Sequence, residues 1–170
     1  MQNDFEHAGN APKLSDQELL DLVQKQTLKY FWDSGHPDSG MALERTHGHF
    51  GSYDIEHTVT TGGTGFGIMA MIAGAERGFI PREELKERMH KICDFLEQSP
   101  KYHGAFPHFM DGRTGETIPF SKLDDGSDTV ETSFLMMGLL CARQYFAEDI
   151  DLKDKINTLW RDVDWNAHGI

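Results

Sequence analysis

The segment from Thr60 to Phe79 is the feature that most constrains the fold of this 170-residue chain. It combines glycine, alanine, methionine and isoleucine without a polar face, in the string TGGTGFGIMAMIAGAERGF. A helix that is apolar nearly all round is buried in the folded protein, and small side chains let neighbouring helices approach closely. We therefore expect a buried, closely packed helix here.

Amphipathic patterns predict four further helices. The clearest begins at Ser15, where Ser15 and Glu18 match a capping box and an apolar stripe continues to about Asp33. Gly35 and Pro37 end this helix. Because no strands alternate with these helices, a parallel sheet is not indicated. The fold class is all-α, with paired helices. The remaining predicted helices span about residues 81–99, 127–146 and 152–163.

Two long segments, 35–57 and 101–124, lie between predicted helices. The second contains a possible short hairpin, with Asp111 and Gly112 as turn residues between two apolar stretches. Because the two segments precede the second and fourth helices, we expect them at the same end of the helix stack. Long loops commonly carry function, so this end is the expected binding site. Residues 1–14 are mostly polar and are expected to form a flexible leader.

The chain is strongly acidic, with a formal net charge of −12. This charge disfavours nucleic acid and anionic membrane surfaces as partners, because both require clustered Lys and Arg. It is compatible with a neutral partner such as a sugar. No apolar stretch is long enough for membrane insertion, and the first residues do not resemble a signal peptide. Cys93 and Cys141 fall on predicted apolar helix faces, where a free thiol is the expected state and a disulfide is the alternative.

An acidic cluster lies at the start of the fourth predicted helix, in the string KLDDGSDTVETSF. It contains Asp124, Asp125, Asp128 and Glu131, of which the last two are neighbours on one helix face. Glycoside hydrolysis needs two carboxyl groups in different environments, one as an acid and one as a base or nucleophile. A purely structural role is also open, since Asp128 at the N-cap with Glu131 at N3 would stabilise the helix start.

Two other kinds of site are disfavoured. Gly65, Gly67 and Ala70 match a G-x-G-x-x-A dinucleotide pattern, but the strand–helix–strand context of that pattern is missing. The candidate metal ligands lack the helical spacing of known metal motifs. They are His47, His49 and either Asp54 or His57.

Aromatic side chains near the loops could either stack on sugars or fill a core. These are Trp32, Phe50, Tyr53, Phe106 and Phe109, with His108 beside them.

Taken together, three strings resemble the glucoamylase-like domain of glycoside hydrolase family 144, the endo-β-1,2-glucanases. They are YFWDSGHPDSGMALER, TTGGTGFGIMAMIAGAERGFI and HGAFPHFMDGRTGETIPFSKLDDGSDTVETSFLMMGLLCARQYF, and the resemblance covers about residues 24–165. It implies an (α/α)6 toroid of helical hairpins that hydrolyses β-1,2-linked glucan with inversion. It also implies a periplasmic or cell-surface location.

The resemblance assigns roles to individual residues. Catalytic roles are expected for Asp124, Asp128 and Glu131, and no metal or other cofactor is implied. Substrate binding is expected from Asp125, Glu44, Arg45, His108, Phe106, Phe109 and Tyr53.

The chain departs from the resembling family in length, because members continue for a few hundred residues beyond the matching segment. Residues 15–170 are therefore expected to be the N-terminal portion of the toroid, with apolar surface left uncovered on the second and fourth helices. Self-association through these helices is one expected consequence, and inactivity of the isolated chain is another. Two alternatives to an enzyme remain open: a carbohydrate-binding remnant without catalysis, and an unrelated helical interaction module.

Overall fold

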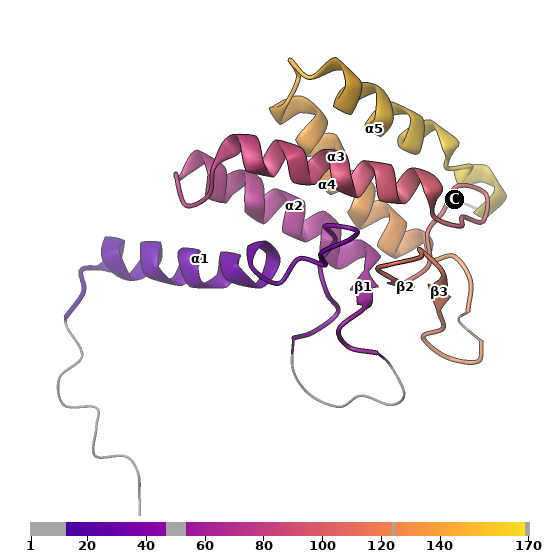
Figure 1. The fold of residues 1–170 in the computed structure, drawn as a ribbon, viewed down its shortest axis with the longest axis horizontal. Coiled ribbons are helices and arrows are strands. Elements are labelled where there is room, and N and C mark those ends of the chain that lie inside the picture. The colour runs from indigo at the N-terminus through magenta and orange to yellow at the C-terminus, as the bar shows by residue number, and fades with distance from the viewer. Residues whose placement is uncertain (1–12, 47–53, 124, 169–170) are drawn as a thin grey trace, which may run out of the picture.

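The computed structural model describes residues 13–46, 54–123 and 125–168 (Figure 1). Within these residues the protein is mostly helical and has one small antiparallel sheet. In chain order the elements are α1 (Asp16–Trp32), β1 (Thr58–Thr60), α2 (Thr61–Glu76), α3 (Arg82–Gln98), β2 (Phe109–Asp111), β3 (Thr117–Ile118), α4 (Thr129–Tyr145), α5 (Ile150–Asp162) and a 3₁₀ turn (Trp165–His168).

All five predicted helices are present close to their expected bounds. The capping box that starts α1 is confirmed, since the Ser15 backbone N–H donates to Glu18 Oε2 and the Glu18 N–H donates to Ser15 Oγ. Helix α5 begins two residues earlier than expected, at Ile150, because Asp149 caps it by accepting from the Leu152 N–H. The prediction of an all-α fold built from paired helices is thus confirmed.

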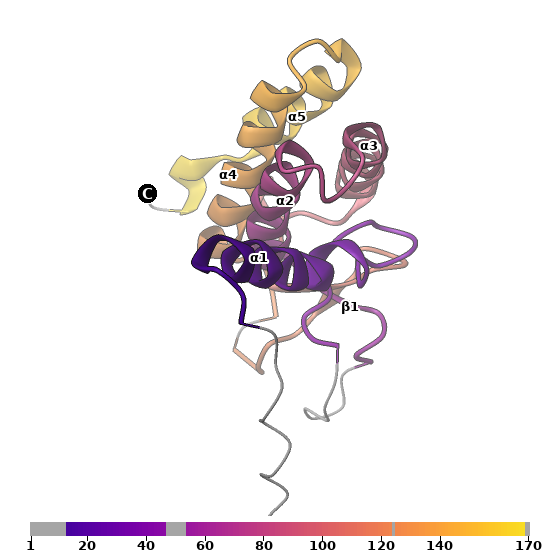
Figure 2. The same ribbon diagram turned by 90° about the vertical axis from the view of Figure 1, so that its left-hand side faces the viewer.

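Helix α2 lies in the middle of the molecule, with α1, α3 and α4 as neighbours (Figure 2). Helices α2 and α4 run parallel, because Gly62 contacts Glu131 near their N-termini and Glu76 bonds to Tyr145 near their C-termini. On the side of this pair that lies opposite α1, helix α3 packs against α5 (Figure 1). This arrangement places the segments that precede α2 and α4 at the same end of the molecule, as predicted.

Glycines explain how closely α2 and α4 pack. A Cβ atom at Gly65 would lie 2.0 Å from the Phe134 carbonyl oxygen, and one at Gly138 would lie 2.3 Å from the Gly65 carbonyl oxygen. Both distances are far below any tolerated carbon–oxygen contact, so the two backbones meet only because side chains are absent. Gly67 similarly faces the Phe31 ring of α1. The glycine-rich string therefore serves helix packing, and its likeness to a dinucleotide loop is accidental.

The sheet has the strand order β1-β2-β3, with both pairs antiparallel. The predicted hairpin is confirmed as β2 and β3, in which Phe109 pairs with Ile118. Strand β1 was not predicted: Thr58 and Val59 fall between the predicted loop 35–57 and the predicted helix, and Thr60 was assigned to the start of that helix. It pairs with β2, so that Thr60 lies opposite Phe109. The sheet adjoins the N-terminal ends of α2 and α4 (Figure 1).

The two cysteines differ in environment, and neither forms a disulfide. Cys93 on α3 is fully buried, and burial raises the pKa of its thiol to about 12. Cys141 on α4 is exposed, beside the apolar side chains of Ile72, Met137 and Leu140. The expectation of free thiols is confirmed, but only Cys93 acts as a core residue.

Part of the apolar surface of the central helices is uncovered, as expected. Phe66 on α2 is 46% exposed, and Val130 and Met137 on α4 are also exposed. Self-association through this surface stays a prediction. Among the described helices, none combines the length and apolar character needed to cross a bilayer.

Candidate functional site

Asp128 is the N-cap of α4. Its Oδ1 accepts hydrogen bonds from the backbone N–H groups of Val130 and Glu131, at 2.9 and 3.0 Å. The structural role considered for Asp128, that of a helix N-cap, is therefore present. The same side chain also turns towards a neighbour, because Oδ2 lies 3.2 Å from Nδ1 of His108. Asp128 thus both caps a helix and contributes to a polar cluster.

Glu131 reaches from α4 to the start of α2. Its Oε2 accepts a hydrogen bond from the Gly62 backbone N–H at 2.9 Å, and its Oε1 lies 4.0 Å from Nε2 of His108. A Cβ atom at Gly62 would lie 2.4 Å from Oε2, so the carboxylate can approach only because residue 62 is glycine. Glu131 therefore lies at the N-termini of two helices, where aligned backbone dipoles favour negative charge.

His108 links the two carboxylates, each of which lies near a different nitrogen of its ring. Backbone hydrogen bonds hold the segment that carries His108 against both helix starts. The carbonyl of His108 accepts from the Thr61 N–H, and the carbonyl of Phe106 accepts from the Asp128 N–H. The starts of α2 and α4 are thus joined through the residues 106–108. Asp128, Glu131 and His108 form what we call the carboxylate cluster.

Aromatic rings line one side of the carboxylate cluster. The Phe120 ring stacks on His108 with the ring centroids 4.8 Å apart, and Phe109 lies edge-on to His108 at 4.4 Å. Phe109 is itself nearly buried, whereas Phe120 is about half exposed. The prediction for Phe106 was wrong, because its ring is fully buried in the hydrophobic core and cannot face a sugar.

Glu44 and Arg45 lie beside β1, since the Glu44 N–H donates to the Thr58 carbonyl. Their side chains form an ion pair with each other, and both are partly exposed. The Tyr30 hydroxyl of α1 donates to the backbone carbonyls of Leu43 and Glu44, which fixes this segment against the helix. The structure thus brings both predicted residues to the sheet end of the molecule.

A histidine pair holds the segment after α1 against the sheet. His36 is 1% exposed, and its Nδ1 accepts from the backbone N–H groups of Asp38 and Ser39. Its Nε2 therefore carries the proton and donates to Nδ1 of His57 at 3.0 Å. Burial lowers the pKa of His36, which keeps the ring neutral as this arrangement requires.

Some predicted residues take no defined place in the carboxylate cluster. Asp124, Tyr53, His47 and His49 lie outside the described residues. Asp125 is exposed in the segment that leads to α4. In the described parts of the chain, no three His, Cys, Asp or Glu side chains are placed so that they could hold a metal ion.

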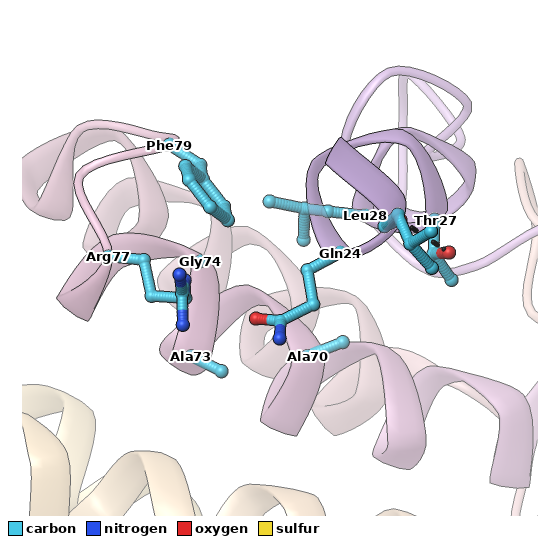
Figure 3. Close-up of a pocket in the computed structure, with 9 residues that line it drawn as sticks. Gln24, Thr27, Leu28, Ala70, Ala73, Gly74, Arg77 and Phe79 are labelled. Atoms are coloured by element: carbon cyan, nitrogen blue, oxygen red, sulfur yellow. Dashed lines mark hydrogen bonds between the residues drawn. The ribbon is translucent and has the colours of Figure 1, made fainter. Parts of the chain in front are cut away.

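A hollow of about 350 Å³ lies between α1 and α2 (Figure 3). Gln24 and Leu28 of α1 face Ala70 and Arg77 of α2 across it. Its lining is mostly apolar and contains no carboxyl group. It also lies near the C-terminal end of α2, on the order of 15 Å along the helix from Gly62. The chemistry of hydrolysis therefore points to the carboxylate cluster instead.

Comparison with known proteins places the chain in a family. Residues 23–164 match the family model described as "Protein of unknown function (DUF3131)". The chain belongs to this family. One relative is the exo β-1,2-glucooligosaccharide sophorohydrolase (non-reducing end) of Parabacteroides distasonis, which is 46% identical over 158 residues. That match covers 90% of this chain and 21% of the relative.

Solved structures agree with this placement. The endo-β-1,2-glucanase from Chitinophaga pinensis, solved with sophorotriose and glucose, is 46% identical with a TM-score of 0.85, and the match covers 90% of this chain and 38% of that one. The β-1,2-glucanase from Parabacteroides distasonis is also 46% identical, with a TM-score of 0.83 and coverage of 90% and 22%. The resemblance to the N-terminal part of the glucoamylase-like domain of glycoside hydrolase family 144 is confirmed. The chain spans less than two fifths of the length of these relatives.

Two contributors to the site of this DUF3131 member were missed from the sequence. Gly62 was interpreted only as a packing residue, although its N–H binds Glu131 from 69 positions away. A glycine in the first turn of a buried helix could have suggested an approaching polar group. Phe120 was not singled out among the aromatic residues, because nothing in the sequence places it on His108.

Proposed function

We propose that this chain is the N-terminal part of a glycoside hydrolase domain that acts on β-1,2-linked glucan, with endo cleavage and inversion. The observation that carries the proposal is the position of Glu131, which is bound by Gly62 across two helix N-termini and lies beside Asp128 and His108. The names of relatives that are 46% identical support the substrate class. An exported location, as the resemblance implies, is part of the same proposal.

The two carboxylates suit different tasks. Inversion needs an acid that protonates the glycosidic oxygen and a base that activates water, about 6.5–9.5 Å apart. Glu131 uses Oε2 for the Gly62 N–H and leaves Oε1 on the side of His108, while two helix N-termini stabilise its negative charge. We assign it the role of the base. Both oxygens of Asp128 are engaged, so we assign it a positioning role. The acid is then a carboxyl group outside this pair.

Sugar hydroxyls are recognised by charged and polar groups that can donate and accept hydrogen bonds. Glu44, Arg45 and His108 supply such groups at the sheet end of the molecule. Phe109 contributes apolar surface beneath His108 and Phe120. We therefore keep these residues as proposed sugar-binding groups, and remove Phe106 from that set.

The first test is reducing-sugar release from linear β-1,2-glucan by the purified chain. Glu131→Gln keeps the shape of the side chain and its bond to Gly62 but removes the base. Release should fall at least about 100-fold, as expected for loss of general base catalysis. Glu97→Gln makes the same change at an exposed position on α3 and should have no effect.

Two other outcomes decide between the alternatives. Glucan binding without release, measured by calorimetry, would favour a carbohydrate-binding piece over an enzyme. Release that persists in Glu131→Gln would contradict the role of Glu131. Absence of both binding and release would contradict a working cleft in this chain alone and would favour a helical module whose acidic residues only stabilise α4.

A further inference from the structure

The histidine pair, His36 and His57, joins three segments that are distant in the sequence. His36 follows α1, and its side chain is almost completely buried. A Cβ atom at Gly112, in the turn between β2 and β3, would lie 2.7 Å from the His36 ring, so this ring packs directly on the backbone of the turn. His57 precedes β1, and its carbonyl accepts from the Gly112 N–H at 2.7 Å. The contact between the two rings therefore holds segment 35–41 against the sheet.

The hydrogen bonds of the pair fix the position of both ring protons. Because Nδ1 of His36 accepts from the N–H groups of Asp38 and Ser39, its ring proton is on Nε2 and points at Nδ1 of His57. The ring proton of a neutral His57 is then on its own Nε2. Each ring thus accepts a hydrogen bond at the one nitrogen that could take up a further proton. A proton added there would face an N–H donor, so this contact requires two neutral rings.

Charged groups near His36 do not reverse this condition. The carboxylates of Asp38 and Asp111 favour a charged His36 ring, whereas the Arg113 guanidinium disfavours it. Burial is the largest of these effects, and it lowers the pKa of His36 below its ordinary value of 6.5. The neutral ring that the hydrogen bonds require is therefore also the form that burial favours.

Two further elements bring charged side chains near the pair. The residues of α3 that line the same hollow as His36 are two acids and two bases, namely Glu84, Glu87, Arg88 and Lys91. Both bases are engaged by backbone carbonyls, since Arg88 donates to Phe31 and Trp32 and Lys91 donates to Pro37. On the segment before β1, Asp54 and Glu56 are exposed, and the Asp54 carboxylate lies 3.6 Å from Arg113. These groups leave no excess of one sign beside the two rings.

We propose that the histidine pair is a pH-sensitive latch, which holds segment 35–41 on the sheet at neutral pH and releases it more often in acid solution. Histidine suits this role because its charge changes between about pH 5 and pH 8. Opening exposes two rings that can each bind a proton, which the closed contact does not allow. The open state therefore binds more protons, so the contact is most stable above about pH 6.5 and weakens as the pH falls below that value.

The latch lies next to residues that were assigned to sugar binding. Segment 35–41 continues through Ala42 to Glu44 and Arg45, and the Ala42 carbonyl accepts from the Thr60 N–H of β1. Opening of the latch would therefore loosen one end of the stretch that carries Glu44 and Arg45. The latch itself does not rest on the proposed function, because it follows from the two rings and their hydrogen bonds alone.

Hydrogen exchange of two backbone amides measures the opening. The Gly40 N–H donates to the carbonyl of His36, and the Gly112 N–H donates to the carbonyl of His57. After correction for the intrinsic exchange rate, the protection of both amides should fall about 100-fold between pH 7.5 and pH 5.5, because each histidine contributes about tenfold. The Phe146 N–H at the C-terminal end of α4 is the internal control, and its protection should change less than about threefold over the same range.

One substitution separates the latch from a general effect of acid. His57→Gln keeps an oxygen that accepts from His36 but cannot take up a proton in this pH range. Its loss of protection should shrink to about tenfold, since only His36 still binds a proton on opening. His90→Gln is the matched control, because it removes a titratable ring that faces Asp149 at the start of α5. This control should retain the full pH dependence.

Several results would overturn the latch. Protection of Gly40 and Gly112 that changes less than about twofold would show that no proton is coupled to opening. An equal loss at Phe146 would assign the effect to the whole molecule, and an unchanged pH dependence in His57→Gln would exclude the pair as its source. A two-bond ¹H–¹⁵N spectrum of the unmodified chain checks the arrangement without any substitution. His36 must carry its proton on Nε2, and a proton on Nδ1 would contradict the proposal.

Discussion

Helices α1 and α2 have similar lengths but owe their positions to different parts of the chain. The start of helix α1 is fixed by the reciprocal hydrogen bonds of Ser15 and Glu18, and Leu28 is the one buried residue of this helix. Helix α2 has no side-chain cap bond at Thr60, yet half of its residues are buried. Local hydrogen bonds define the first helix, and packing defines the second.

This difference explains where the candidate site lies. Glu131 is bound by the N–H of Gly62, at the start of the helix that depends on packing. The geometry of the site therefore depends on contacts between segments that are distant in the sequence. Changes in the α2–α4 contact should have larger effects than changes at the start of α1, and four substitutions can test this order.

The largest effect is expected from Gly65→Ala. The new Cβ would meet the Phe134 carbonyl at 2.0 Å, and neither backbone can move without separating α2 from α4. We expect the free energy of unfolding to fall by about 3 kcal/mol, at the upper end for overpacking. Urea denaturation measures it. Gly126→Ala is the control, since no atom lies within 4 Å of the place that its new Cβ would take; equal stability of the two variants would refute the close contact.

Asp128→Ala should have the second largest effect on stability. It removes the cap that accepts from the N–H groups of Val130 and Glu131, which costs about 1 kcal/mol for an ordinary helix. The measurement is the shift of the urea midpoint relative to Asp125→Ala, which removes an exposed acid from the preceding segment. If the two variants unfold at the same midpoint, the capping role of Asp128 is wrong.

A smaller effect, dependent on pH, is expected at the turn between β2 and β3. Hydrogen bonds from Arg113 lower the pKa of Asp111 to about 2 from its ordinary value of 3.8. The ionised carboxylate therefore stabilises the folded state above about pH 4, and this contribution is lost as the pH falls towards 2. Because Arg113 is half exposed, we expect less than about 1 kcal/mol.

The substitution that tests this effect is Asp111→Asn. Its stability is measured by urea unfolding at several pH values. The variant should be less stable than the unmodified chain at pH 6, and the difference should shrink on acidification. A difference that stayed constant between pH 6 and pH 2 would show that ionisation of Asp111 does not contribute.

The smallest effect is expected from Ser15→Ala at the exposed start of α1. This substitution removes one half of the capping box. We expect the free energy of unfolding to fall by about 0.5 kcal/mol, the low end of capping effects. Thermal unfolding followed by circular dichroism, with Lys25→Ala as an exposed control in the same helix, would measure it. A loss as large as that of Gly65→Ala would remove the distinction between the two helices.

The same distinction decides what could be predicted from the sequence. The ends of α1 and α3 follow from a capping box and a charged face that lie within a few residues. Strand β1 could not be predicted, because three residues carry too little alternation and its partner β2 lies some fifty residues further along the chain. The spacing of Asp128 and Glu131 on one helix turn left both a capping role and a catalytic role open, and their choice as expected catalytic residues came from the family resemblance.

The rest of the site depends on contacts that no local pattern contains. Gly62 meets Glu131, and Phe120 meets His108, only after the chain has folded. Phe106 was misassigned for the same reason. It lies two residues from His108, yet its ring enters the core while His108 remains partly exposed. Proximity in sequence did not show which of the two faces the solvent.

The contrast between the cysteines has a practical consequence for spectroscopy. Cys93 is buried, and its raised pKa of about 12 leaves almost no reactive thiolate at neutral pH. Cys141 is exposed on α4. A maleimide dye or nitroxide should therefore attach at a single position without any engineering of the chain. That label would lie on the helix whose first turn carries Glu131, and it would report whether α4 responds to an added oligosaccharide.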